Sequence, residues 1–205
     1  MNTTKCLITS SGIHPLGRSL RTIYSENDNV EIIEYDEALG HDLSDPAQFE
    51  NLISDLADCA LFFNIGYPEH QEELLRRAFE LQNELMIINL NVEPNTALID
   101  NNANPKLTEY LKNKQSLDQQ IRALQKLQQD NQTGQLCWII NLRMDASSAI
   151  AWEFGHQIID AYDVAVYIYQ TLGFWPKVAV QDLLIKPTFF NHEQNVKDGI
   201  LSPSP

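Results

Sequence analysis

Six short, almost wholly apolar segments alternate with segments of helical periodicity, and this alternation constrains the fold more than any other feature. The apolar segments, which predict strands, span residues 5–11, 30–37, 57–66, 85–92, 135–144 and 178–187. The predicted helices between them span residues 12–27, 42–56, 68–84, 107–131 and 160–174. Strands that are apolar along their length are buried on both faces, and therefore parallel. The sequence predicts an α/β fold: a doubly wound parallel sheet with helices on both faces.

The length and composition fit one compact domain. The chain has 205 residues, of which 43% are hydrophobic and 20% charged, which is enough to bury a single core. We therefore predict one domain over residues 1–187. Residues 188–205 are polar and end in prolines, so we expect a tail that is partly extended or poorly ordered.

Three cysteines indicate the compartment. Cys6, Cys59 and Cys137 are odd in number, widely spaced and set in apolar segments, so we expect buried thiols in a reducing compartment, the cytoplasm. No apolar run reaches the ~18 residues of a membrane span, and the amino terminus lacks the features of a signal peptide. The five histidines lack metal-ligand spacing, so no metal site is predicted.

The net charge limits the partners. A formal charge of −14 repels a phosphate backbone and an anionic lipid surface, so nucleic acid and membranes are not expected partners. An anionic cofactor would need local groups, such as the backbone amides at the amino end of a helix.

The first strand leads into a glycine-containing connection. Ligands of doubly wound sheets bind at the carboxyl ends of the strands, and "TSSGIHPLGRSL" places Gly12 and Gly17 between strand and helix, where backbone can approach a pyrophosphate. Thr9, Ser11 and Leu16 belong to the same connection and are candidate cofactor-binding residues. The alternative is a tight turn that binds no ligand.

Acidic and amide side chains follow the next strands. Asp36 ends the second strand, where an acid can accept hydrogen bonds from an adenosine ribose and favours NAD over NADP; a solvated acidic turn is the alternative. The same crevice would be lined by Asp42 with Leu43, and by Asn64 with Gly66, although each could instead cap a local turn.

The segment "YLKNK" breaks the pattern of its helix. The spacing of Leu107, Leu111, Leu117 and the later apolar residues places both Tyr110 and Lys114 on the inward stripe. A buried cation costs desolvation unless something compensates it, so this lysine indicates either a functional acid–base pair or a side chain that extends to solvent.

In this order, "ITSSGIHPLG", "HDLSDP", "FNIG", "IINLN", "YLKNKQSLDQQIRAL" and "DVAVYIYQTL" resemble the short-chain dehydrogenase/reductase superfamily, in a compact form. The resemblance implies a Rossmann-type sheet of about seven strands, bound NAD or NADP, and hydride transfer to or from a carbonyl or alcohol. It implies that Tyr110 is the general acid/base, and that Lys114 stabilises its deprotonated form and holds the nicotinamide ribose.

The chain departs from the family pattern in three places. Ser10 stands where the family has its first glycine, and Asn91 or Val92 where it has a catalytic serine; Asn91 can donate to a substrate oxygen, whereas Val92 cannot. Between Gly66 and Leu85 the chain is about twenty residues shorter than the pattern, which removes the helix that carries the family's catalytic asparagine.

Two kinds of function follow. The first is an NAD(P)-dependent oxidoreductase of a small carbonyl or alcohol, with Tyr110, Lys114 and Asn91 as catalytic residues and NAD(H) favoured over NADP(H). The alternative is a non-catalytic relative, either a dinucleotide sensor or an interaction protein that binds no cofactor. A homodimer is also predicted, because the Tyr110 helix has apolar residues on more than one side.

Overall fold

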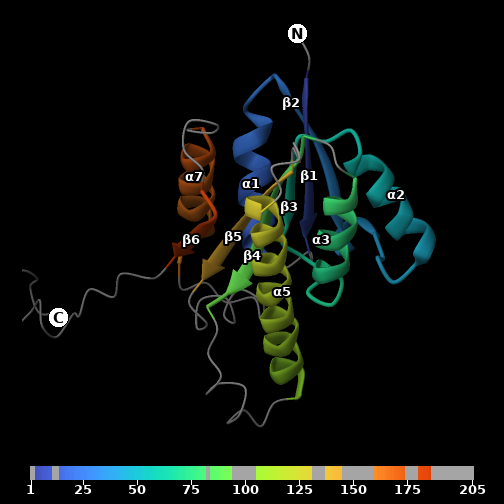
Figure 1. Cartoon of the computed structure of the whole chain (residues 1–205). Coiled ribbons are helices and arrows are strands. Elements are labelled where there is room, and N and C mark those ends of the chain that lie inside the picture. The colour runs from blue at the N-terminus through green and yellow to red at the C-terminus, as the bar shows by residue number, and fades with distance from the viewer. Residues whose placement is uncertain are drawn as a thin grey trace, which may run out of the picture.

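A single parallel sheet of six strands forms the centre of the protein (Figure 1). The computed structural model describes residues 3–10, 14–81, 84–93, 105–130, 137–144, 159–173 and 180–185. The strands are β1 (Thr4–Ser10), β2 (Val30–Asp36), β3 (Leu61–Asn64), β4 (Met86–Val92), β5 (Trp138–Met144) and β6 (Asp182–Ile185). They lie in the order β2-β1-β3-β4-β5-β6, all parallel, which confirms the predicted fold class.

Helices cover both faces of this sheet (Figure 1). The helices α1 (Pro15–Ser25) and α7 (Ala161–Leu172) pack side by side on one face. The other face carries α2 (Pro46–Leu56), α3 (Gln71–Glu80) and α5 (Pro105–Asp130), and a 3-10 turn, η1 (Glu37–Leu39), follows β2. None of the described helices is long and apolar enough to cross a membrane.

Short polar residues and prolines set the helix starts. Pro15 and Pro46 occupy the first turns of α1 and α2, where the missing N–H costs nothing. The Asp45 carboxylate accepts a hydrogen bond from the backbone N–H of Ala47 and so caps α2. The neighbouring Ser44 does not cap this helix, because its hydroxyl donates to Asp42 instead.

Alternate residues of each inner strand enter two separate cores. On β1, Cys6 and Ile8 face α1 and α7, whereas Leu7 faces the opposite core, and all three are fully buried. The three cysteines are buried and unbridged, as predicted. This burial on both faces is why the strands are apolar throughout.

One row of polar side chains interrupts the second core. In register across five strands lie Thr9, Asn64, Asn89, Asn141 and Asp182, hereafter the polar row. The Asn64 Nδ2 atom donates to Asn89 Oδ1 at 2.8 Å, and Asn141 Nδ2 donates to Asp118 of α5 at 3.0 Å. The row therefore links the middle of the sheet to the helix layer above it.

The strand order reverses between β1 and β3. From β1 the chain moves outward to β2 and then returns to β3 on the other side of β1, so the crossovers diverge at the carboxyl ends of these two strands. The amino-terminal turns of α5 extend beyond the carboxyl ends of the strands (Figure 1). This edge is where a ligand of such a sheet binds.

Candidate functional site

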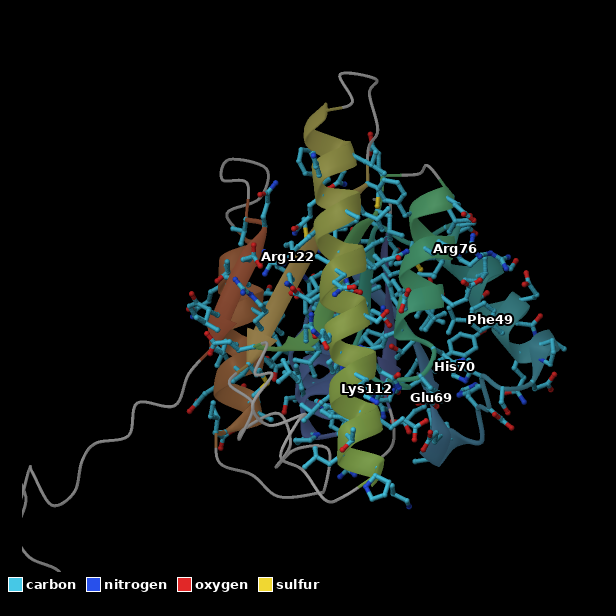
Figure 2. The ribbon with its side chains drawn as sticks, turned by 60° about the horizontal axis from the view of Figure 1, so that its bottom comes forward. Phe49, Glu69, His70, Arg76, Lys112 and Arg122 are labelled. Atoms are coloured by element: carbon cyan, nitrogen blue, oxygen red, sulfur yellow. The ribbon has the colours of Figure 1, made fainter. Side chains whose placement is uncertain are left out.

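The ammonium group of Lys114 is buried at the carboxyl edge of the sheet. Lys114 is 3% exposed, and its Nζ atom donates to the backbone oxygen of Leu90 at 2.9 Å and to Oε1 of Gln71 at 2.5 Å. Lys112, two residues earlier on α5, lies on the exposed outer side (Figure 2). The predicted inward position of Lys114 is confirmed, and the alternative of a side chain extending to solvent is wrong.

Tyr110 lies one helical turn before Lys114. It is 7% exposed, and the Lys114 Nζ atom is 5.4 Å from the centre of its ring, which is a cation–π distance. Tyr110 and Leu111 pack in the core beneath α1 and α7, whereas Leu117 and Ile121 of the same helix pack in the opposite core. The amino-terminal part of α5 thus reaches around the end of the sheet and brings the phenol to the side of α1.

His14 connects this pair to the start of α1. It is the residue before Pro15 and is 2% exposed. Burial and the positive charge of Lys114 lower the pKa of His14 to about 3, so its imidazole is neutral. His14 lies between the carboxyl end of β1 and the start of α1, and Lys114 bonds to Leu90 near the carboxyl end of β4, so the amino end of α1 and the buried ammonium group lie at the same edge of the sheet.

Gln71 is the central polar residue beneath the lysine. Besides accepting from Lys114, its side-chain Nε2 donates to the backbone oxygen atoms of Asn64 at 2.7 Å and Ile65 at 3.2 Å. Its own backbone oxygen accepts from Asn64 Nδ2 at 2.9 Å. Gln71 therefore fixes the position of the hydrogen-bond acceptor of Lys114 relative to the end of β3.

The side chain of Asn91 is hydrogen-bonded to α5. Its Nδ2 atom donates to Asp118 at 3.4 Å, and its Oδ1 accepts from the backbone N–H of Val92. Asp118 also accepts from Asn141 and pairs with Arg122 at 2.6 Å. A role of Asn91 toward a substrate oxygen stays a prediction, and it would require the bond to Asp118 to open.

Gly17 allows a close approach of α1 to β1. The expectation that it lies between strand and helix is wrong, because Pro15 begins the helix and Gly17 is its third residue. A Cβ atom at Gly17 would lie 2.6 Å from Oγ and 2.9 Å from Cβ of Ser10. This glycine therefore contacts the protein itself, and Leu16 beside it is a fully buried core residue.

The rest of the first connection is only partly described. Ser11 and Gly12 lie outside the described residues. Thr9 is fully buried; its hydroxyl donates to the Phe63 oxygen at 3.2 Å and accepts from the Ile65 N–H at 3.1 Å. Thr9 thus joins β1 to the end of β3 at the point where strand order reverses.

The amino end of α1 has no side-chain cap. The residue in the capping position, His14, makes no capping hydrogen bond, and the first turn contains no acidic residue. By contrast, Asp45 caps α2 and Asp160 caps α7. In the part of the chain that the structure describes, no carboxylate caps these amides at the positive end of the α1 dipole, which suits a bound anion.

Acidic side chains gather at the end of β2. Asp36 is 5% exposed and its Oδ1 caps η1 by accepting from the N–H of Ala38 at 2.8 Å, whereas residues 37–40 of the turn itself are exposed. A role of Asp36 toward a ribose stays a prediction. Burial and the carboxylates of Glu69, Asp36 and Asp42 raise the pKa of Glu37. Four carboxylates therefore share one small region.

Tyr67 lies among these carboxylates. Burial and their negative charge raise its pKa, and its hydroxyl donates to the His41 oxygen at 3.0 Å. Its φ of 54° is in the left-handed region, which costs energy for a bulky residue and often marks functional sites. Figure 2 shows the neighbouring Glu69 and His70 beside the amino-terminal half of α5.

Four further predicted residues have structural contacts. Asp42 is exposed and bonds to Ser44, and Leu43 is 2% exposed within the core. Asn64 is fully buried in the polar row, and the N–H of Gly66 donates to the Thr9 oxygen at 3.1 Å. These residues lie along the carboxyl edge, but only Asp42 presents an exposed side chain.

Gln71 and Asp118 were not predicted from the sequence. Asp118 follows Lys114 by one helical turn, so the spacing that placed Lys114 inward would also have found it. Gln71 gives no such signal, because it meets Lys114 across 43 residues of sequence. Among the described residues, no group of three or more histidine, cysteine or acidic side chains is placed to hold a metal ion.

Comparison with solved structures identifies the class of fold. No protein-family model and no curated protein matches the sequence. A GDP-L-fucose synthetase from Naegleria fowleri bound to NADP matches with a TM-score of 0.60 and 10% identity, over 98% of this chain and 84% of that one. An enoyl-[acyl-carrier-protein] reductase (NADH) from Aquifex aeolicus matches with a TM-score of 0.58 and 10% identity, over 98% and 99%.

A short-chain dehydrogenase from Leptospira borgpetersenii with bound NAD+ matches with a TM-score of 0.53 and 12% identity, over 90% of this chain and 92% of that one. At such low identity these likenesses establish the fold. The chain has the Rossmann-type fold of short-chain dehydrogenases/reductases, as the resemblance in its sequence implied. It has six described strands where the family pattern has about seven.

Proposed function

We propose that the protein is an NAD(H)-dependent oxidoreductase that acts on a small carbonyl or alcohol. The observation that carries this proposal is the buried Lys114 ammonium group, which lies one turn from Tyr110. Its charge also acts on His14, the residue before α1. A cation is retained at the carboxyl edge of an otherwise apolar sheet, where proteins of this fold bind their ligands. The matched proteins with bound NADP and NAD+ support this kind of cofactor.

The residues of this edge fit a dinucleotide. The uncapped amino end of α1 offers backbone amides to a pyrophosphate, and Gly17 brings that helix close to β1. Asp36 uses one carboxylate oxygen to cap η1, and its other oxygen remains for a ribose hydroxyl. The nearby Glu37, Asp42 and Glu69 would repel the additional phosphate of NADP(H), so we favour NAD(H).

Tyr110 and Lys114 would perform the proton chemistry. Tyr110 would donate a proton to the carbonyl oxygen during reduction and accept it during oxidation. The adjacent ammonium group favours the deprotonated phenol, and Gln71 keeps that group in place. NADH, when bound, would supply the hydride.

A titration tests cofactor binding first. We expect NADH to raise the melting temperature of the wild-type protein and NADPH to raise it less, because a ligand of the native state stabilises that state. Asp36→Asn should reduce the difference between the two dinucleotides. No shift with either dinucleotide would contradict the proposal.

Turnover is then measured as loss of NADH absorbance with a panel of small aldehydes and ketones. Tyr110→Phe should abolish turnover and keep NADH binding. The matched control is Tyr167→Phe, at a half-exposed tyrosine on the outer side of α7, which should behave like the wild type. Equal turnover of Tyr110→Phe and wild type would exclude Tyr110 from the mechanism.

A non-catalytic dinucleotide-binding protein is the second candidate. It is favoured by the two protein acceptors of Lys114, which give the ammonium group a structural role. It is also favoured by Val92 at the end of β4, because valine has no hydroxyl at a place where the family pattern has its catalytic serine. This candidate predicts the same binding of NADH without turnover of any substrate in the panel.

A further inference from the structure

A pocket of about 360 Å³ opens at the edge of the sheet opposite the site described above. Its inner wall is formed by the first residues of three strands, including Thr4, Leu61 and Met86. The carboxyl-terminal parts of α1 and α7 form its sides, with Tyr24 from α1 and Tyr169 from α7. Its volume lies in the range of small-molecule sites.

The pocket is separate from the proposed dinucleotide site. Thr4 begins β1 and Ser10 ends it, so the two edges are about 20 Å apart at ~3.3 Å per residue. A ligand at the amino edge would leave the carboxyl edge open. Binding in this pocket therefore does not depend on the proposed oxidoreductase function.

The surface of the pocket is largely apolar and aromatic. Leu61, Met86 and Leu172 contribute aliphatic or thioether groups. The rings of Tyr24 and Tyr169 meet edge to face, with centres 5.2 Å apart and planes at 79°. Such a surface gains free energy by covering an apolar ligand, and aromatic side chains attract a cation that lies over a ring face.

The backbone makes this pocket electronegative. Both α1 and α7 run toward the amino edge and end there, and neither has a basic residue in its last turn. The carboxyl end of a helix carries about half a negative charge, and here two such ends border one pocket without a basic side chain in the last turn of either helix. The net charge of the protein, −14, acts in the same direction.

We propose that this pocket binds a small organic cation with an apolar body, such as an aromatic amine with one or two rings. The apolar surface would cover the body, while the tyrosine rings and the two helix ends would favour the ammonium group. An anion of the same size would be repelled.

The test uses three probes of one shape: 1-naphthylmethylamine, 1-naphthylmethanol and 1-naphthoate. Affinity is measured by titration calorimetry, and the location by NMR of the methyl groups of Leu61, Met86 and Leu172. We expect the amine to bind at least tenfold more tightly than the carboxylate and to shift these methyl signals. The inference is overturned if no probe binds, if the amine has no advantage over the other two, or if other methyl groups shift instead.

Two variants and one control test whether the amine binds in this pocket. Tyr169→Ala removes a lining ring and should weaken amine binding at least fivefold. Tyr167→Ala, which removes an exposed tyrosine of the same helix outside the pocket, should leave it unchanged. Gln170→Lys adds a positive charge at the lining and should reverse the preference toward the carboxylate, even if Tyr169→Ala fails to fold. An unchanged preference in Gln170→Lys would overturn the electrostatic argument.

Discussion

The Nζ atom of Lys114 donates a hydrogen bond to Oε1 of Gln71, and this bond joins α5 to α3 behind the end of β3. Gln71 in turn donates to the backbone of Asn64 and Ile65. The position of the ammonium group is therefore set by a residue that is itself held on two sides. A buried charge held this way is stable only while each partner remains.

Lys114→Met should destabilise the protein. The substitution leaves Oε1 of Gln71 buried without its donor, which costs about 1–3 kcal/mol. Lys112→Met removes an exposed lysine of the same helix and should change the free energy of unfolding by less than about 0.5 kcal/mol. Urea denaturation of both variants measures the difference, and equal stabilities would show that the buried contacts contribute nothing.

Gln71→Leu should have a larger effect than a comparable surface change. It removes the acceptor of Lys114 and the donor to two backbone oxygen atoms, so we expect a loss of about 3 kcal/mol. Gln119→Leu, at an exposed position of α5, is the control. A loss below about 1 kcal/mol would mean that water replaces the amide without penalty.

Gly17→Ala should reverse the usual helix preference. Alanine normally stabilises a helix interior by about 1 kcal/mol relative to glycine. Here its Cβ would lie 2.6 Å from Oγ of Ser10, so we expect destabilisation by about 2 kcal/mol.

The double variant Ser10→Gly/Gly17→Ala tests this cause. Removing the Ser10 side chain opens the space, so the double variant should be more stable than the sum of the single effects predicts. Strict additivity would show that Ser10 is not what restricts residue 17. Thr22→Ala, on the exposed side of α1, controls for general effects on this helix.

His14 should make stability fall at acidic pH. The folded protein keeps this imidazole neutral down to its pKa of about 3, whereas the unfolded chain takes up the proton near pH 6.5. The unfolded state therefore binds more protons in this window, and the contribution of His14 is complete above pH 6.5 and is lost as the pH falls toward 3. The slope from this residue is about 1.4 kcal/mol per pH unit.

Urea denaturation at several pH values isolates this contribution. His14→Gln should lower the slope of the free energy of unfolding against pH by that amount, because glutamine does not titrate. An identical slope in His14→Gln would show that His14 is protonated in the folded state as easily as in the unfolded chain.

Apolar periodicity was sufficient to predict the architecture. All six strands and five helices lie where the pattern placed them, with ends that differ by a few residues. The inward position of Lys114 was also predictable, because a helix has a fixed period and its neighbours defined the buried stripe. These features depend on local spacing along the chain.

The partners of the buried polar groups were not predictable. Gln71 meets Lys114, and Asn91 meets Asp118, through contacts between elements far apart in sequence. Gly17 shows the same limit: its spacing suited a phosphate-binding turn, but its closest contact is Ser10. Which atoms a glycine or an amide contacts depends on how the helices pack on the sheet.

The polar row has a consequence for folding. If a strand such as β4 shifted by two residues against its neighbour, every apolar side chain would still face its own side of the sheet. Asn89 would then lie opposite an isoleucine or an arginine of β5 in place of Asn141. The aligned amides thus penalise slipped strand pairings that hydrophobicity alone would tolerate, and so help the chain avoid misfolded sheets.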